Sequence, residues 1–108
     1  VIILSYKNID GIFETLDSVF VQDYPNVEII ISDDGTPGFS EHISRIEEYI
    51  RLKKGLNIKN AVINAIKKNG GTVKNINSAI NLAKGDYIKL LAASRDAIKS
   101  HTKAITQT

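Results

Sequence analysis

The apolar residues of this chain are arranged in two alternating patterns. Continuous apolar runs rich in β-branched residues occupy residues 1–5 and 27–32, which is typical of strands buried on both faces. A similar run covers residues 58–66, where the letters also fit a helix, and we assign it to a strand. Residues 87–91 complete a set of four predicted strands.

Between these strands the apolar residues recur at helical spacing. Asp10 is predicted to cap the first helix, which ends before Tyr24-Pro25-Asn26. Ser40 is predicted to cap the second helix, and the third begins at Thr72 and ends before Gly85. The residues expected to face the core are Ile12, Phe13, Leu16, Val19 and Phe20, then Ile43, Ile46 and Ile50, then Val73, Ile76, Ile80 and Ala83.

Strands and helices that alternate along a chain specify a parallel sheet with helices on both faces. We therefore predict an α/β fold, a three-layer sandwich around a mostly parallel, Rossmann-like sheet. Such sheets bind ligands beyond the carboxyl ends of their strands. The segments expected to converge there are Ser5-Tyr6-Lys7-Asn8, Asp33-Asp34-Gly35, Asn69-Gly70-Gly71 and residues 92–96.

The Asp33-Asp34 pair is unusual because two adjacent carboxylates repel each other. Gly35 lets the backbone turn sharply after the pair, so we expect both side chains to face an open crevice. An Asx turn, in which a carboxylate accepts backbone N–H groups after the strand, is an ordinary structural explanation for one of the two.

Length and composition narrow the class of protein. A chain of 108 residues fits one domain, and 14 basic against 12 acidic side chains give no argument for a nucleic-acid partner. No apolar run approaches the roughly 20 residues that span a bilayer. The absence of cysteine excludes disulfides and thiolate metal sites and fits the cytoplasm, where we expect the protein to act. Because methionine is also absent and the chain starts within a predicted strand, we expect both natural ends to be missing.

Three stretches, in this order, resemble the amino-terminal half of the family 2 glycosyltransferases: "ILSYKN", "QDYPNVEIIISDDG" and "NGGTVKNINSAINLAKGDYIKLLAA". The resemblance covers residues 1–93 and leaves 94–108 as an unmatched tail, with a short helix allowed over residues 96–105. It implies a truncated nucleotide-diphospho-sugar transferase (GT-A) fold. It also implies a UDP- or dTDP-sugar donor, a saccharide acceptor and inversion at the anomeric carbon, in the synthesis of a polysaccharide.

The same resemblance implies roles for residues of the rim. Ser5 and Tyr6 would cradle the nucleotide, although Tyr6 could equally cover the edge of the core. Asp34 would accept a hydrogen bond from the imide of uracil or thymine, and Asp33 would hold the loop and approach the ribose. An ionised carboxylate only accepts, so it suits an imide N–H and discriminates against cytosine. The other implied nucleotide-binding residues are Gly35, Asn69, Gly71, Lys74 and Asn77, of which Lys74 could also be simply solvated.

The chain departs from the family after the fourth strand. Family members carry acidic residues there that hold Mg²⁺ or Mn²⁺, whereas this chain reads Leu91-Ala92-Ala93-Ser94-Arg95-Asp96. Hard divalent cations need anionic oxygen ligands, so Asp96 is a weak candidate and no metal site is predicted. Arg95 could pair with phosphate instead. A deletion, truncation or frame change near Ser94 explains the loss more simply, and we expect the chain to be inactive, with weak nucleotide binding at most.

No residue matches the catalytic base of the family, so the catalytic residues are unknown. His42 and His101 could act as bases, but surface positions explain both. Two other classes stay open: a phospho-receiver domain, whose acidic pair should follow the first strand, and an interaction module that lost its ligand. Exposed strand edges and an uncovered face also lead us to expect self-association.

Overall fold

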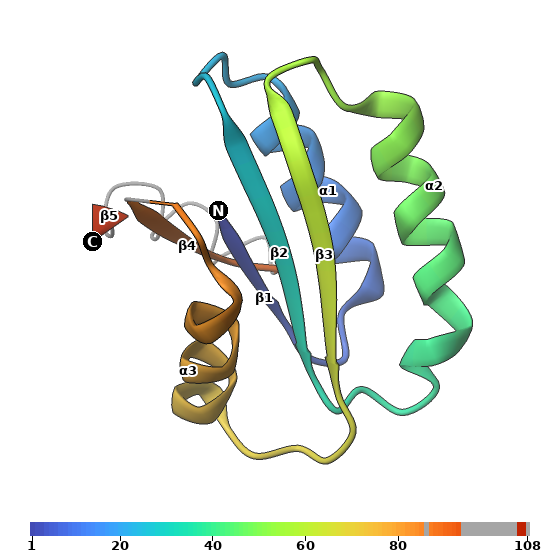
Figure 1. The fold of residues 1–108 in the computed structure, drawn as a ribbon. Helices are drawn as coiled ribbons and strands as arrows, with labels where there is room; N and C mark the ends of the chain where they lie inside the picture. Colours follow the sequence, from blue (N-terminus) through green and yellow to red (C-terminus); the bar gives the residue numbers. More distant parts are fainter. Residues whose placement is uncertain (86, 94–105, 108) are drawn as a thin grey trace.

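The computed structural model describes residues 1–85, 87–93 and 106–107 (Figure 1). The strands of the sheet lie in the order β3-β2-β1-β4-β5. The first four are parallel, and β5 is antiparallel to β4. The strands are β1 (Ile2–Ser5), β2 (Val27–Asp34), β3 (Ile58–Ile66), β4 (Ile88–Ala92) and β5 (Thr106–Gln107). The helices are α1 (Ile9–Phe20), the 3-10 helix η1 (Phe39–His42), α2 (Ile43–Lys53) and α3 (Thr72–Leu82).

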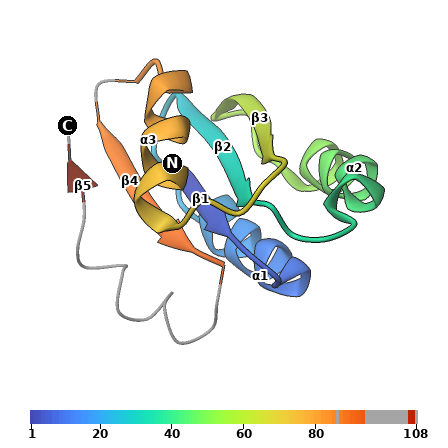
Figure 2. The ribbon, with the colours of Figure 1, turned by 90° about the horizontal axis from the view of Figure 1, so that it is seen from below.

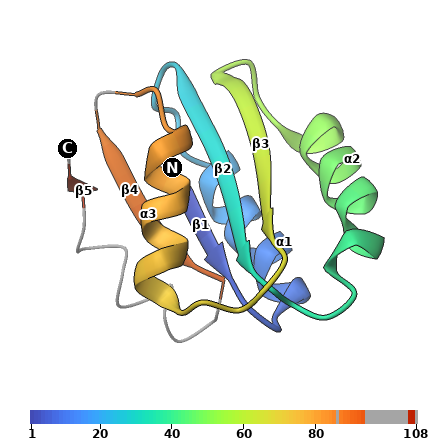
Figure 3. The same ribbon diagram turned by 60° about the horizontal axis from the view of Figure 1, so that its bottom comes forward.

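Helices cover both faces of the sheet (Figure 2, Figure 3). α1 and α2 pack on one face and connect strands that follow each other toward the β3 edge. α3 returns the chain from β3 past β1 to β4, so a right-handed crossover places it on the opposite face. The predicted three-layer sandwich with a mostly parallel sheet is confirmed. No helix in the described ranges is long and apolar enough to cross a membrane.

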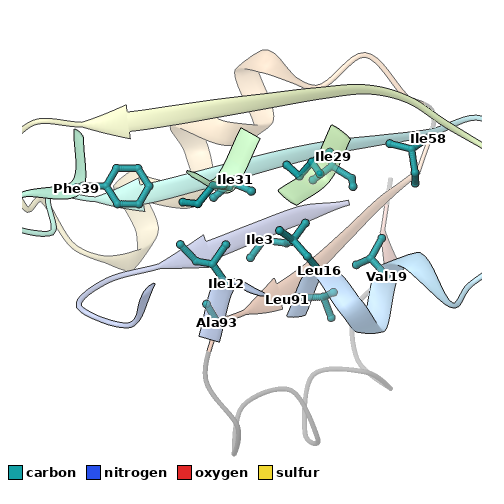
Figure 4. Packing of buried hydrophobic residues seen from close by; sticks show 12 residues of the cluster. Ile3, Ile12, Leu16, Val19, Ile29, Ile31, Phe39, Ile58, Leu91 and Ala93 are labelled. Atoms are coloured by element: carbon teal, nitrogen blue, oxygen red, sulfur yellow. The ribbon is translucent and has the colours of Figure 1, made fainter. Parts of the chain in front are cut away.

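Strand side chains alternate between two apolar clusters, because successive residues of a strand point to opposite faces. The larger cluster lies between the sheet and α1 and α2, as Figure 4 shows for Ile3, Ile31 and Leu16. The smaller cluster lies under α3 and contains Ile2, Ile30 and Ala79. β1 and β2 are therefore buried on both faces, as their continuous apolar runs predict.

Both predicted helix caps are wrong. α1 is capped by Asn8, whose side chain accepts a hydrogen bond from the Gly11 N–H at 3.0 Å, and Asp10 lies in the first turn. Ser40 lies inside η1, and α2 begins only after His42. Asn8 caps α1 because its side chain reaches a free N–H group, whereas His42 precedes α2 without a side-chain cap hydrogen bond.

The predicted buried face of α3 is also wrong in part. Val73 and Ile80 are 71% and 39% exposed, whereas Asn75 and Ala79 are buried. Asn75 donates to and accepts from Ser32 of β2, and this pairing fixes which side of the helix meets the sheet. A count of apolar letters misses it because the buried residue is polar.

The ends of three strands differ from the prediction. β1 starts one residue later, at Ile2. β2 continues through Asp33 and Asp34, which pair with Ala65 and Ile66 of β3, so the acidic pair ends the strand instead of forming the loop. β4 starts and ends one residue later than predicted. β3 has its predicted bounds. The helix predicted for 96–105 lies outside the described residues.

The orientation of α3 can be tested by placing substitutions on its two sides. Val73→Lys should change the free energy of unfolding by less than about 0.5 kcal/mol, because the site is solvated. Ala79→Leu should lower it by roughly 1–3 kcal/mol, because the side chain has no room against the sheet. Urea denaturation measures both, and a larger loss from Val73→Lys than from Ala79→Leu would contradict this orientation.

Candidate functional site

The segments that follow the four parallel strands converge on one rim of the sheet. The Asn8 side chain, after β1, donates to the carbonyl of Ala93, just beyond β4. Ser5 at the end of β1 is paired with Asp33 of β2 and donates to its carboxylate at 2.7 Å. The predicted convergence of these segments is confirmed for the described part of the chain.

Asp33 and Asp34 are buried, at 1% and 5% exposure. Since they are neighbours in a strand, their side chains point to opposite faces of the sheet. Asp33 contacts the loops after β1 and β2, and Asp34 contacts the loop before α3. The expectation that both face one open crevice is therefore wrong, because each carboxylate is surrounded by its own donors.

Asp33 ties two loops together. Its carboxylate accepts bonds from the Ser5 hydroxyl at 2.7 Å, the Thr36 N–H at 2.8 Å and the Thr36 hydroxyl at 2.7 Å. The Lys7 N–H in turn donates to the Thr36 hydroxyl oxygen at 2.8 Å. The Asx-turn explanation fits Asp33, which satisfies a backbone N–H just after its strand.

Asp34 fastens a distant loop to the end of β2. Its Oδ2 accepts the Asn69 side-chain N–H and the Gly71 N–H, and its Oδ1 accepts the Gly70 N–H, each at 2.9 Å. The Asn69 side chain also donates to the backbone carbonyl of Asp34 at 3.1 Å. The predicted neighbours Asp34, Asn69 and Gly71 thus form one hydrogen-bonded unit.

Two glycines give this unit its shape. Gly35 has φ 84°, and a Cβ there would lie 2.6 Å from the Asn69 backbone nitrogen, so the two loops touch through their backbones. Gly71 has φ 98° and ψ 164°, a conformation almost restricted to glycine. This conformation turns the chain into α3 directly after the Gly70 and Gly71 N–H groups that donate to the same carboxylate.

The other predicted residues are more exposed. Tyr6 is 43% exposed, and the Lys7 ammonium lies 5.2 Å from the centre of its ring. Lys74 is exposed with its stem over Gly70, where a Cβ would lie 3.1 Å from Lys74 Cδ. Asn77 is exposed on α3. His42 immediately precedes α2, and His101 lies outside the described residues.

Sequence reasoning missed Thr36, Ser32 and Asn75. Thr36 links the loops after β1 and β2, and Ser32 pairs with Asn75 beneath the Asp34 unit. The sequence contains no clear signal for Asn75, because its neighbours one turn away on the helix include the polar Thr72 and Ser78.

The described residues at the end of β4 offer no side-chain oxygen to a divalent cation. Leu91 and Ala92 have no side-chain oxygen, and the stretch Ser94-Arg95-Asp96 lies outside the described residues. Within the described ranges, no three His, Cys, Asp or Glu side chains come together in a group that could hold a metal ion. The chemistry at the rim that the structure describes is therefore hydrogen bonding to carboxylates and backbone amides.

A hollow of about 530 Å³ lies away from this rim. Its lining includes Val1, Val27 and Ile88 at the starts of parallel strands, together with Tyr24 and Tyr87. It is thus at the amino ends of the strands, opposite the side where parallel sheets bind their ligands. We assign the candidate site to the rim because the converging polar groups are there.

The fold and rim together define a Rossmann-like α/β domain of the GT-A type. A family model described as glycosyl transferase family 2 matches residues 1–93, and the chain belongs to this family. A curated relative is the "Amylovoran biosynthesis glycosyltransferase AmsB" of Erwinia amylovora, 33% identical over 94 residues. The match covers 86% of this chain but 29% of that relative, so the chain spans less than a third of its length. No solved structure gives a significant match.

The link through Thr36 predicts a selective effect of removing its hydroxyl. Thr36→Val should lower the free energy of unfolding by roughly 1–3 kcal/mol, because Asp33 loses a donor and the Lys7 N–H loses its acceptor. Thr36→Ser keeps the hydroxyl and is the matched control. Urea denaturation measures the free energy of unfolding of both variants. Equal losses in Thr36→Val and Thr36→Ser would show that the hydroxyl does not hold the loops.

Proposed function

We propose that this chain is the nucleotide-binding part of a glycosyltransferase that uses a UDP- or dTDP-sugar and extends a saccharide in polysaccharide biosynthesis. Family membership supports the reaction class, and the name of the relative places that protein in amylovoran biosynthesis. A phospho-receiver is disfavoured because Ser5 ends β1 and is followed by Tyr6-Lys7, whereas the acidic pair ends β2. A cytoplasmic location stays a prediction.

The observation that carries this proposal is that the Asp34 carboxylate has one hydrogen-bond acceptor position more than it has donors. An ionised carboxylate offers about four acceptor positions, and the Asn69, Gly70 and Gly71 donors use three. The remaining position suits the imide N–H of uracil or thymine, and Asp34 as a residue keeps 5% of its surface exposed. Cytosine has an unprotonated ring nitrogen at the equivalent place, so it would set an acceptor against an acceptor.

Charges at the rim favour the rest of such a donor. Lys7, Lys68 and Lys74 are exposed there, and a nucleoside diphosphate brings negative charge to them. Tyr6, whose ring is partly exposed, offers a face for stacking a pyrimidine. Both features strengthen binding without choosing between bases, so Asp34 supplies the selectivity.

In the proposed reaction an acceptor hydroxyl oxygen bonds to the anomeric carbon as the bond from that carbon to the diphosphate oxygen breaks. The nucleoside diphosphate leaves, a base takes the hydroxyl proton, and attack from the opposite side inverts the centre. No residue of this chain is assigned as that base. Because the described residues at the end of β4 also offer no metal ligand, we propose that the chain binds donor nucleotide but does not turn it over.

Base selectivity tests the role of Asp34. By calorimetric titration, UDP should bind the wild-type chain more tightly than CDP. Asp34→Asn should weaken UDP binding about 10- to 100-fold, because the charge-assisted bond to the imide is lost. The loss for CDP should be much smaller, so the preference for uracil should largely disappear.

Asp33→Asn is the matched control, since it also neutralises a buried carboxylate of the rim. It should loosen the loops but keep the preference of UDP over CDP. A thermal melt of each variant separates loss of fold from loss of binding. If Asp33→Asn abolishes the preference and Asp34→Asn does not, the assignment to Asp34 is wrong, and a cooperative melt without any nucleotide binding would favour a non-catalytic interaction module.

Metal dependence provides an independent check. We expect UDP affinity to be the same with Mn²⁺ or with EDTA, because Leu91 and Ala92 offer no ligand. Incubation with UDP-sugars and saccharide acceptors should release no UDP above the rate of a chain-free blank. Tighter UDP binding with Mn²⁺, or turnover, would refute the proposal that this chain is an inactive nucleotide-binding piece.

A further inference from the structure

A buried polar cluster joins α3 to the middle of the sheet. The Ser32 hydroxyl donates to Asn75 Oδ1 at 2.5 Å, and Asn75 Nδ2 donates to the Ser32 carbonyl at 3.0 Å. Asn64 Nδ2 donates to the hydroxyl oxygens of Ser32 and Ser78, both at 2.9 Å. Ser32 and Asn75 are 0% and 3% exposed, so no nucleotide contacts them in this arrangement.

Burying the polar Ser32–Asn75 pair costs free energy of desolvation, so we ask what the pair contributes besides stability. Burying an amide and a hydroxyl saves no free energy over an apolar pair of similar size, because both must first lose water. Their reciprocal bonds are directional, however, and fix the rotation and height of the helix on the sheet. Apolar packing under α3 is thin, since its fully buried apolar contribution to that face is Ala79.

The cluster is connected to Asp34 by a short series of bonds. The Asn75 N–H donates to the Gly71 carbonyl at 3.0 Å, and the Gly71 N–H donates to Asp34 Oδ2 at 2.9 Å. Ser32 and Asp34 are two residues apart in β2 and therefore point to the same face. The first turn of α3 and the loop before it are thus fastened to one strand at two points.

We propose that Asn75, held by Ser32, is a positioning residue for Asp34. It sets the place of the Gly70 and Gly71 N–H groups, which in turn orient the carboxylate toward the pyrimidine. The role in nucleotide binding rests on the proposed function, while the effect on the two glycine amides does not. Asn75 therefore tunes base recognition from a buried site.

Amide hydrogen exchange by NMR on the 108-residue chain reads the positioning directly and without nucleotide. Asn75→Ala should speed exchange at Gly70 and Gly71 about 3- to 10-fold, the equivalent of one lost hydrogen bond. The exchange rates of amides in the centre of β1 and β2 should change far less. Ser32→Ala, which keeps the bond from Asn75 Nδ2 to the Ser32 carbonyl, should give a smaller change and is available if Asn75→Ala does not fold.

Ser78→Ala is the matched control, since it removes one bond of the same cluster but leaves the Ser32–Asn75 pair intact. Exchange at Gly70 and Gly71 should match the wild type in this variant. Unchanged exchange at these amides in Asn75→Ala, or a rise shared equally by β1 and β2, would overturn the proposal, because Asn75 would then only stabilise the fold.

UDP titration of the same variants completes the test. UDP affinity should fall in Asn75→Ala in step with the exchange rates and stay unchanged in Ser78→Ala. If the glycine amides respond but UDP affinity does not, the link from Asn75 to base recognition is refuted. If the wild-type chain binds no UDP, the proposed function fails, and the exchange rates alone still decide whether Asn75 positions the loop.

Discussion

The interaction on which this structure depends is the buried carboxylate of Asp34 with the N–H groups of Gly70 and Gly71. A carboxylate taken out of water costs several kcal/mol unless it is paired or fully hydrogen-bonded. Here the Asn69 side chain completes the set, and each bond is strengthened by the charge. The same contacts that hold α3 against the end of β2 therefore shape the rim, so the fold and the candidate site cannot be separated.

Asp33 and Asp34 each hold different loops and do not form one acidic patch. Because strand residues alternate between faces, Asp33 holds the loops after β1 and β2, and Asp34 holds the loop before α3. Separate sets of donors offset the repulsion between the neighbouring charges. This arrangement leaves Asp34 with one acceptor position beyond its three donors, next to the loop that carries Lys68 and leads to Lys74, which is why we place nucleotide recognition there.

The sequence predicts the strands and the layer order well, since continuous β-branched runs have few alternatives in an alternating α/β pattern. It predicts the buried face of α3 poorly, because Asn75 is buried by a partner 43 residues earlier in the chain. The predicted cap of α1 fails because Asn8 and Asp10 both lie near the start of the helix, and that of α2 fails because no side chain caps this helix. Thr36 has no recognisable signal, since its role arises only when two loops meet.

The central claim is that a uridine nucleotide binds at the rim beside Asp34, and a titration of UDP followed by ¹H–¹⁵N NMR tests this most directly. We expect the amide signals of Gly70 and Gly71 to shift with UDP and to shift much less with CDP at the same concentration. Shifts confined to the hollow near Tyr24 and Tyr87, with the two glycine amides unmoved, would contradict it.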